Sequence, residues 1–142
     1  MVRLSKPVRV ALVGAALMVL LAASAHAKRA PTTSERKAIR TAIEVFIDSR
    51  GSPAASDNRV ARIRVSTVNA HFARVDLFSP SAGPSTTLLK KKRTGWKVVA
   101  FGSADFSCSL APNGVWGDLF GSGFCVEPDD DSVVPYASIP FR

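Results

Sequence analysis

Between residues 33 and 49 apolar side chains recur every three or four positions, which is the spacing of a helix with one buried face. The repeat runs through Ala38, Ile39, Ala42, Ile43, Phe46 and Ile47. Thr32 followed by Glu35 has the spacing of a capping box, and Arg50-Gly51 is a typical helix end. The sequence therefore predicts a helix over residues 33–49.

From Val60 onward apolar and polar residues alternate, as in strands with one buried face. The alternation covers residues 60–65 and, after a break at 67–70, residues 72–78. A Pro- and Gly-containing loop over 79–85 then leads to two more strands, 86–92 and 96–101, which are joined across 93–95. We expect an α+β fold, with the helix packed on a curved antiparallel sheet of about four strands.

The two faces of this sheet differ in polarity. The face expected to meet the helix carries Ile63, Val65, Val75, Leu77, Trp96, Val98 and Ala100. The other face mixes apolar and basic residues, namely Arg62, Arg64, Phe72, Arg74, Phe78, Lys97, Val99 and Phe101. This mixed face needs a partial cover, and residues 106–124 supply it. We expect a short helix there, beginning near Pro112, that pairs Val115 with Leu119 and Trp116 with Phe120.

The N-terminus has the three parts of a secretory signal peptide. Basic residues at positions 3, 6 and 9 precede an uncharged run from Val10 to Ala25, and Ala25-His26-Ala27 is a cleavage site of the A-x-A kind. A retained anchor is the alternative, although a spanning helix needs about 20 apolar residues and this run is shorter. We expect cleavage after Ala27 and a mature chain without a transmembrane span, in the secreted or cell-envelope compartment. Its Ala- and Arg-rich composition suggests a bacterial source.

Three segments follow from these patterns: a signal peptide over 1–27, one α+β domain over 28–126, and an acidic, Pro-containing flexible tail over 127–142. Cys108 and Cys125 are the two cysteines of the chain. Metal sites built from cysteine pairs use closer spacing and more ligands. Disulfides form in exported proteins, so we expect these two cysteines to be bonded to each other. In the chain-entropy model such a bridge stabilises the fold by about 3 kcal/mol, and it would hold the 106–124 segment in place.

Charge is distributed unevenly along the 142-residue chain, whose net charge is +8. Basic residues dominate 28–97, whereas acids dominate 98–142. This asymmetry indicates either an anionic partner for the first part or an acidic tail folded over it. The strongest local signal is Lys90-Lys91-Lys92-Arg93 at a strand end and turn. It is either a charged edge that resists aggregation or a docking point for an anionic polymer or membrane surface, with Arg62, Arg64 and Arg74 as neighbours. Export from the cytoplasm argues against a nucleic-acid partner.

No catalytic, cofactor or metal site is predicted. His71, the one histidine after residue 27, lies beside an expected turn, where a polar hairpin role suits it better than general base catalysis. Asp105 and Asp118 are expected to form a turn and a polar helix face, and Asp129-Asp130-Asp131 lacks the spacing of a calcium loop. Phosphate-loop and hydrolase motifs are missing from the sequence. The sequence leaves open whether the protein is an enzyme, but it favours a non-enzymatic role.

The order of one helix and two hairpins, with the second hairpin ending in Gly95-Trp96-Lys97-Val98-Val99, resembles the cystatin-like or NTF2-like α+β superfamily over about residues 32–102. The resemblance implies a helix packed in a curved antiparallel sheet, and it implies a fold rather than an activity. The chain lacks the Gln-x-Val-x-Gly loop and Pro-Trp hairpin of cystatin protease inhibitors, and the extra N-terminal helices of NTF2-like enzymes.

Three hypotheses of function remain. The first is a non-enzymatic binding domain, secreted or in the envelope, that contacts an anionic partner through Lys90 to Arg93 and the neighbouring arginines. The second is a small-ligand or enzymatic pocket of the NTF2-like kind on the concave face of the sheet. The third is a structural accessory module for another envelope protein, which an exposed apolar patch near Trp116 and Phe120 would favour.

Overall fold

The computed structural model describes residues 28–51, 57–103 and 105–136. Their elements in chain order are α1 (Thr33–Ser49), β1 (Arg59–Val65), β2 (Phe72–Ser79), β3 (Gly83–Lys92), β4 (Gly95–Gly102), the 3-10 turn η1 (Cys108–Leu110), α3 (Val115–Phe120), β5 (Phe124–Val126) and β6 (Val133–Pro135). The expected signal peptide and its cleavage site lie outside the described residues. Within the described ranges, no helix has the length and apolar character needed to cross a bilayer.

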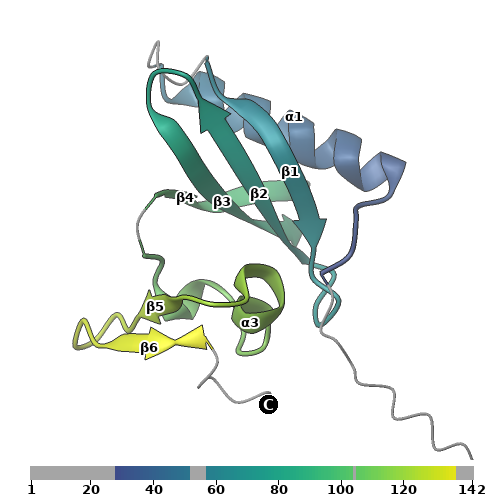
Figure 1. Ribbon diagram of the computed structural model, residues 1–142. Helices are drawn as coiled ribbons and strands as arrows, with labels where there is room; N and C mark the ends of the chain where they lie inside the picture. Colours follow the sequence, from purple (N-terminus) through teal and green to yellow (C-terminus); the bar gives the residue numbers. More distant parts are fainter. Residues whose placement is uncertain (1–27, 52–56, 104, 137–142) are drawn as a thin grey trace, which may run out of the picture.

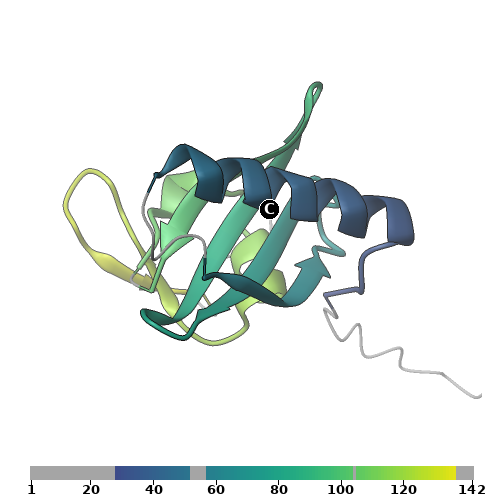
Figure 2. The same ribbon diagram turned by 90° about the horizontal axis from the view of Figure 1, so that it is seen from above.

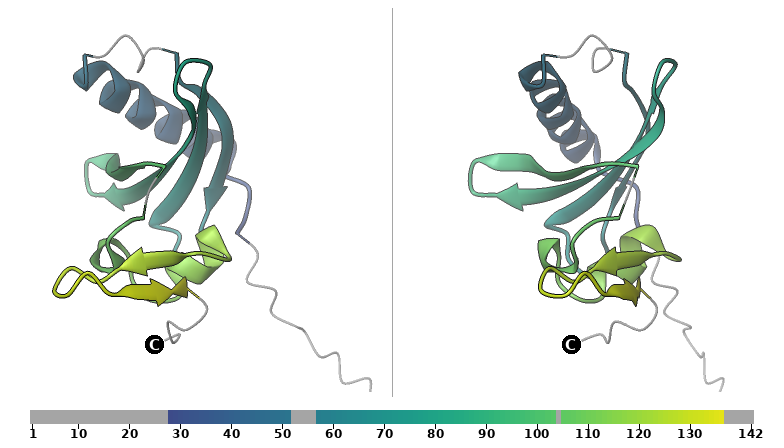
Figure 3. Two further views of the ribbon diagram at one scale, coloured as in Figure 1. Left: turned by 60° about the vertical axis from the view of Figure 1, so that its left-hand side comes forward. Right: turned by 90° about the vertical axis from the view of Figure 1, so that its left-hand side faces the viewer.

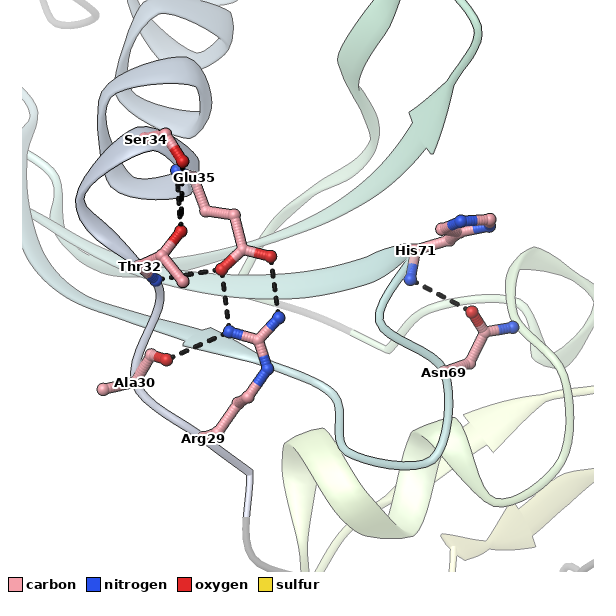
Figure 4. A network of polar contacts seen from close by, with 7 residues as sticks. All are labelled: Arg29, Ala30, Thr32, Ser34, Glu35, Asn69 and His71. Atoms are coloured by element: carbon pink, nitrogen blue, oxygen red, sulfur yellow. Dashed lines mark hydrogen bonds and ion pairs between the residues drawn. The ribbon is translucent and has the colours of Figure 1, made fainter.

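The predicted helix and its capping box are confirmed in α1 (Figure 4). The Glu35 amide donates to Thr32 Oγ1 at 3.2 Å, and the Thr32 amide donates back to Glu35 Oε2 at 2.9 Å. Arg29 donates to both carboxylate oxygens of Glu35 at 2.7 Å. These bonds, above all those from Arg29, lower the pKa of Glu35 to about 2. The first helical turn is thus fixed to the segment that precedes it.

Strands β1 to β4 form one antiparallel sheet in sequence order, and α1 lies across one of its faces (Figure 2). The buried residues between helix and sheet are apolar: Ile39, Ile43, Ile63, Val65, Ala73, Val75, Leu77, Leu89 and Trp96. The predicted α+β class, with one helix on a four-stranded antiparallel sheet, is therefore confirmed. Burial of one face of each element explains why the apolar period changes from 3.6 to 2 along the chain.

A β-bulge in β4 changes the predicted face of its last residues. Leu88 pairs with Ala100, but Leu89 pairs with Val98, so Val99 is an extra residue in β4. Because side chains alternate along a strand, one extra residue moves every later side chain to the opposite face of the sheet. The prediction was therefore wrong for two positions. Ala100 packs against the C-terminal segment, and Phe101 packs on the α1 side, with its ring centroid 5.5 Å from that of Phe46.

The C-terminal segment, made of η1, α3, β5 and β6, packs on the other face of the sheet (Figure 1). The predicted Cys108–Cys125 disulfide is confirmed, with a Cα–Cα distance of 5.0 Å. The short predicted helix is α3, in which the rings of Trp116 and Phe120 lie 5.2 Å apart. Trp116 is fully buried and donates from Nε1 to the Cys108 carbonyl at 3.1 Å. A second apolar core thus lies between this segment and the sheet.

The folded body reaches further along the chain than the domain boundary at residue 126 that we expected. Strand β6 pairs with β5, and the buried ring of Tyr136 stacks on Trp116 at 5.4 Å. Gly123 permits this stacking, because a Cβ there would lie 2.9 Å from the Tyr136 ring. The apolar residues at 133–136, rather than the acids at 129–131, therefore decide where the tail sits. Residues 137–142 lie outside the described part.

Candidate functional site

The β3–β4 hairpin carries the densest positive charge of the described chain. Lys90, Lys91, Lys92 and Arg93 are all exposed, and among the ion pairs of the described residues none includes them. We call Lys90–Arg93 the cationic tip. Figure 3 shows the hairpin projecting to the left in its right-hand view, apart from the C-terminal segment. The tip is therefore accessible to a partner.

Two contacts hold the β3 side of the cationic tip. The Lys91 amide donates to the His71 carbonyl at 2.7 Å, which ties β3 to the β1–β2 turn. The Lys90 ammonium lies 5.4 Å from the centroid of the Phe72 ring, a cation–π arrangement. The Lys90 side chain is thus partly structural, whereas the side chains of Lys91, Lys92 and Arg93 have no comparable contact among the described residues.

Beside the hairpin, an open groove runs between α1 and β4. Its volume is about 670 Å³. We call it the α1–β4 groove; its lining is largely apolar and includes Ala38, Ala42, Val45, Phe46, Trp96 and Val98. Lys37 and Lys97 line it with exposed side chains, and the lining contains no acidic residue. Since β4 is the last strand of the sheet, this groove lies along a sheet edge.

The candidate arginines differ in their distance from the tip. Arg62 and Arg64 belong to β1, at the opposite edge of the sheet, whereas Arg74 belongs to β2, in which Phe72, two residues earlier, pairs with Lys90 of the tip. Asp76 accepts a hydrogen bond from Arg74 Nε at 2.6 Å and lies 4.0 Å from Arg64 Nη2. The Arg74 guanidinium also lies 4.8 Å from the Phe120 ring centroid.

Arg64 and Arg74 are therefore partly buried and paired with Asp76, while Arg62 is exposed. Lys28 lies close to this second basic cluster. Burial, followed by the charges of Arg64 and Arg74, lowers the pKa of its ammonium. The structure thus places Arg62 and Arg64 apart from the cationic tip, with Arg74 on the strand between them and β3.

Asp118 is the polar residue whose role sequence analysis missed. We expected it on the polar face of a helix, but it is 1% exposed. Its carboxylate accepts from Ser66 Oγ at 2.6 Å, from the Thr67 amide at 2.7 Å and from Thr67 Oγ1 at 3.1 Å. Asp118 therefore fixes the C-terminal segment to the β1–β2 turn. The Ser66-Thr67 pair directly after β1 is the sequence signal for a buried polar contact, but no local pattern identifies an acceptor 52 residues away.

The remaining chemical candidates take structural positions. The His71 side chain is exposed, and its amide donates to Asn69 Oδ1 at 3.0 Å in the β1–β2 turn (Figure 4). Ser66 has an acidic partner but is fully buried, so no substrate could reach its hydroxyl. In the part of the chain that the structure covers, no three His, Cys, Asp or Glu residues gather as metal ligands.

Comparisons with protein-family models, with curated proteins and with solved structures find no match to this chain. The resemblance to the cystatin-like or NTF2-like superfamily therefore stays a prediction. The function has to be argued from the cationic tip and the groove beside it.

Proposed function

We propose that this chain is a non-enzymatic binding domain of the secreted or cell-envelope compartment and that it docks an anionic polymer or membrane surface through the cationic tip. One observation carries the proposal: four adjacent exposed cations stand on a projecting hairpin, and no described carboxylate pairs with them. Four like charges repel one another unless an anion lies nearby. An external partner supplies that charge.

The position of these cations favours docking over edge protection. A strand edge is protected by charges distributed along it. Here β4 carries Lys97 as its one charged residue, while the four cations gather at the strand end and turn. Lysine also suits an extended anionic surface, because its ammonium is a flexible point charge without the planar fork of arginine.

The geometry favours such docking over an enclosed small-ligand site. Ile39, Ile43 and Trp96 fill the space between α1 and the sheet. The C-terminal segment covers Phe72 and Leu88 on the other face. The hollow beside α1 is an open groove at the edge of the sheet, which exposes a ligand to solvent along one side.

The test compares two triple charge reversals in the oxidised chain from residue 28 to 142. The tip variant changes Lys91, Lys92 and Arg93 to Glu and leaves Lys90 on Phe72. The control changes three other exposed cations, Arg36, Arg40 and Arg59, to Glu, so both variants have the same net charge. The probes are phosphatidylglycerol-containing vesicles and inorganic polyphosphate.

We expect the tip variant to bind at least about tenfold more weakly than the wild type, since each cation near an anionic surface contributes about 1 kcal/mol. Higher salt should weaken wild-type binding in the same direction. Equal losses in both variants, or binding that neither salt nor the tip variant changes, would contradict the proposal.

A further inference from the structure

We infer that the α1–β4 groove binds an extended acidic segment of a partner polypeptide, which adds to the sheet as a strand alongside β4. The inference rests on the proposed function, because the cationic tip lies at the end of the same strand. It goes beyond that function by naming a second contact surface and the chemistry of the partner.

The edge of β4 supplies the backbone part of this site. β4 pairs with β3 along one side, and it is the outermost strand of the described sheet. The N–H and C=O groups on its other side therefore have no strand partner among the described residues. An extended segment satisfies such groups by adding a strand, which gives affinity through the main chain.

The groove supplies the side-chain part. A strand added along β4 sends every second side chain toward α1. There it meets Val45, which is 61% exposed, and the partly buried Phe46 and Val98. Covering these residues removes apolar surface from water at about 25 cal/mol per Å². Apolar residues at alternate positions of the partner fit this surface.

Charge selects an acidic partner. Lys37 lies on the helix side of the groove and Lys97 on the strand side, with no acid in the lining. The cationic tip continues this charge beyond Gly95. Acidic residues between the apolar ones would point to the other face of the sheet, on which Lys97 lies, while Lys37 adds attraction for an acidic segment from the helix side.

The same features disfavour two other occupants. A second copy pairing through β4 in a symmetric dimer would offer these cations no opposite charge, because neither β4 nor the groove lining contains an acidic residue. A lipid bilayer is flat on this scale, so it can touch the tip but cannot enter a groove between a helix and a strand. A flexible polypeptide avoids both problems.

The experiment uses a fluorescent decapeptide of alternating Asp and Val, and the same peptide N-methylated at every second residue. N-methylation keeps the side chains and charge but removes the N–H donors that pair strands. We expect the methylated peptide to bind the wild type at least about tenfold more weakly. Amide exchange at Trp96 to Val98 should slow when the unmethylated peptide binds.

A matched pair of variants tests the groove itself. Val45 and Val133 are both more than half exposed, but only Val45 lines the groove. Val45→Glu should weaken binding of the unmethylated peptide at least about tenfold, because it removes apolar contact and repels the acidic segment. Val133→Glu should leave its dissociation constant within about twofold of the wild type.

The outcomes separate this inference from the proposed function. Equal binding of the two peptides, or equal effects of the two variants, overturns the inference. Tip-dependent binding of polyphosphate or vesicles without peptide binding overturns the inference and leaves the proposed function standing. If the chain binds neither the peptides nor polyphosphate nor the vesicles, both the inference and the proposed function are overturned. Dimerisation that Val45→Glu abolishes would assign the groove to a second copy and so also overturn the inference.

Discussion

Replacement of Asp118 should detach the C-terminal segment from the β1–β2 turn. The carboxylate is buried and accepts from Ser66 Oγ and from both the amide and hydroxyl of Thr67. Asp118→Ala leaves these donors without their acceptor and opens a small cavity. Asp118→Asn keeps the volume but replaces one acceptor oxygen by an NH₂ group that faces the donors.

The magnitude follows from the number of buried donors. A buried donor left unpaired costs about 1–3 kcal/mol, and the contributions of neighbours are not additive. Ser66 and the Thr67 amide are the closest donors, so we expect Asp118→Ala to lower the free energy of unfolding by about 3–5 kcal/mol. Asp118→Asn should lower it by about 2–3 kcal/mol. Both values are a large share of the about 5–15 kcal/mol that stabilises an ordinary domain.

Urea unfolding of the oxidised chain, followed by tryptophan fluorescence, measures these changes. Asp129→Ala is the control, because Asp129 is exposed, and its effect should stay within about 0.5 kcal/mol. In a double-mutant cycle, Ser66→Ala and Asp118→Asn should show a coupling of about 1–2 kcal/mol. A loss below about 1 kcal/mol for Asp118→Ala, or additivity of the two substitutions, would refute the role of Asp118 as an anchor.

Three further changes test other parts of the fold. Reduction of the disulfide, or replacement of Cys108 and Cys125 by Ser, should lower the free energy of unfolding by about 3 kcal/mol; an unchanged urea midpoint would show that the bridge does not constrain the unfolded chain. Thr87→Val should be neutral or stabilising by up to about 1 kcal/mol, because the buried Thr87 hydroxyl has no hydrogen-bond partner among the described residues; a clear loss of stability would reveal a partner. Glu35→Gln should cost about 1–2 kcal/mol at pH 6, after allowance for solvent screening. Since the folded pKa of Glu35 lies near 2, below its usual 4.5, this difference should shrink as the pH falls from about 5 to 2; a difference that persists at pH 2 would contradict the ion pair with Arg29.

The sequence by itself determined the local elements and their chemistry. The apolar period set the bounds of α1, and Thr32 with Glu35 set its capping box. Alternation located β1 and β2, the turn residues located β3 and β4 although β3 begins at Gly83 inside the predicted loop, and two cysteines in a chain with an export pattern predicted the bridge. The run Lys90 to Arg93 was also visible as a charged turn. The helix, the strands and the charged turn each depend on residues a few positions apart. The disulfide joins distant residues, but a chain with two cysteines allows one pairing.

The tertiary structure decided what depends on distant parts of the chain. The extra residue in β4 placed Phe101 beneath α1 and Ala100 against the C-terminal segment, and only strand pairing reveals such a bulge. Asp118 reached a turn 52 residues earlier because the packing of Trp116 and its neighbours carried it there. The sheet order also separated Arg62 and Arg64 from the cationic tip and left β4 at the edge beside α1. Side-chain period is a local property, whereas strand order, register and buried polar partners are set by how the whole chain packs.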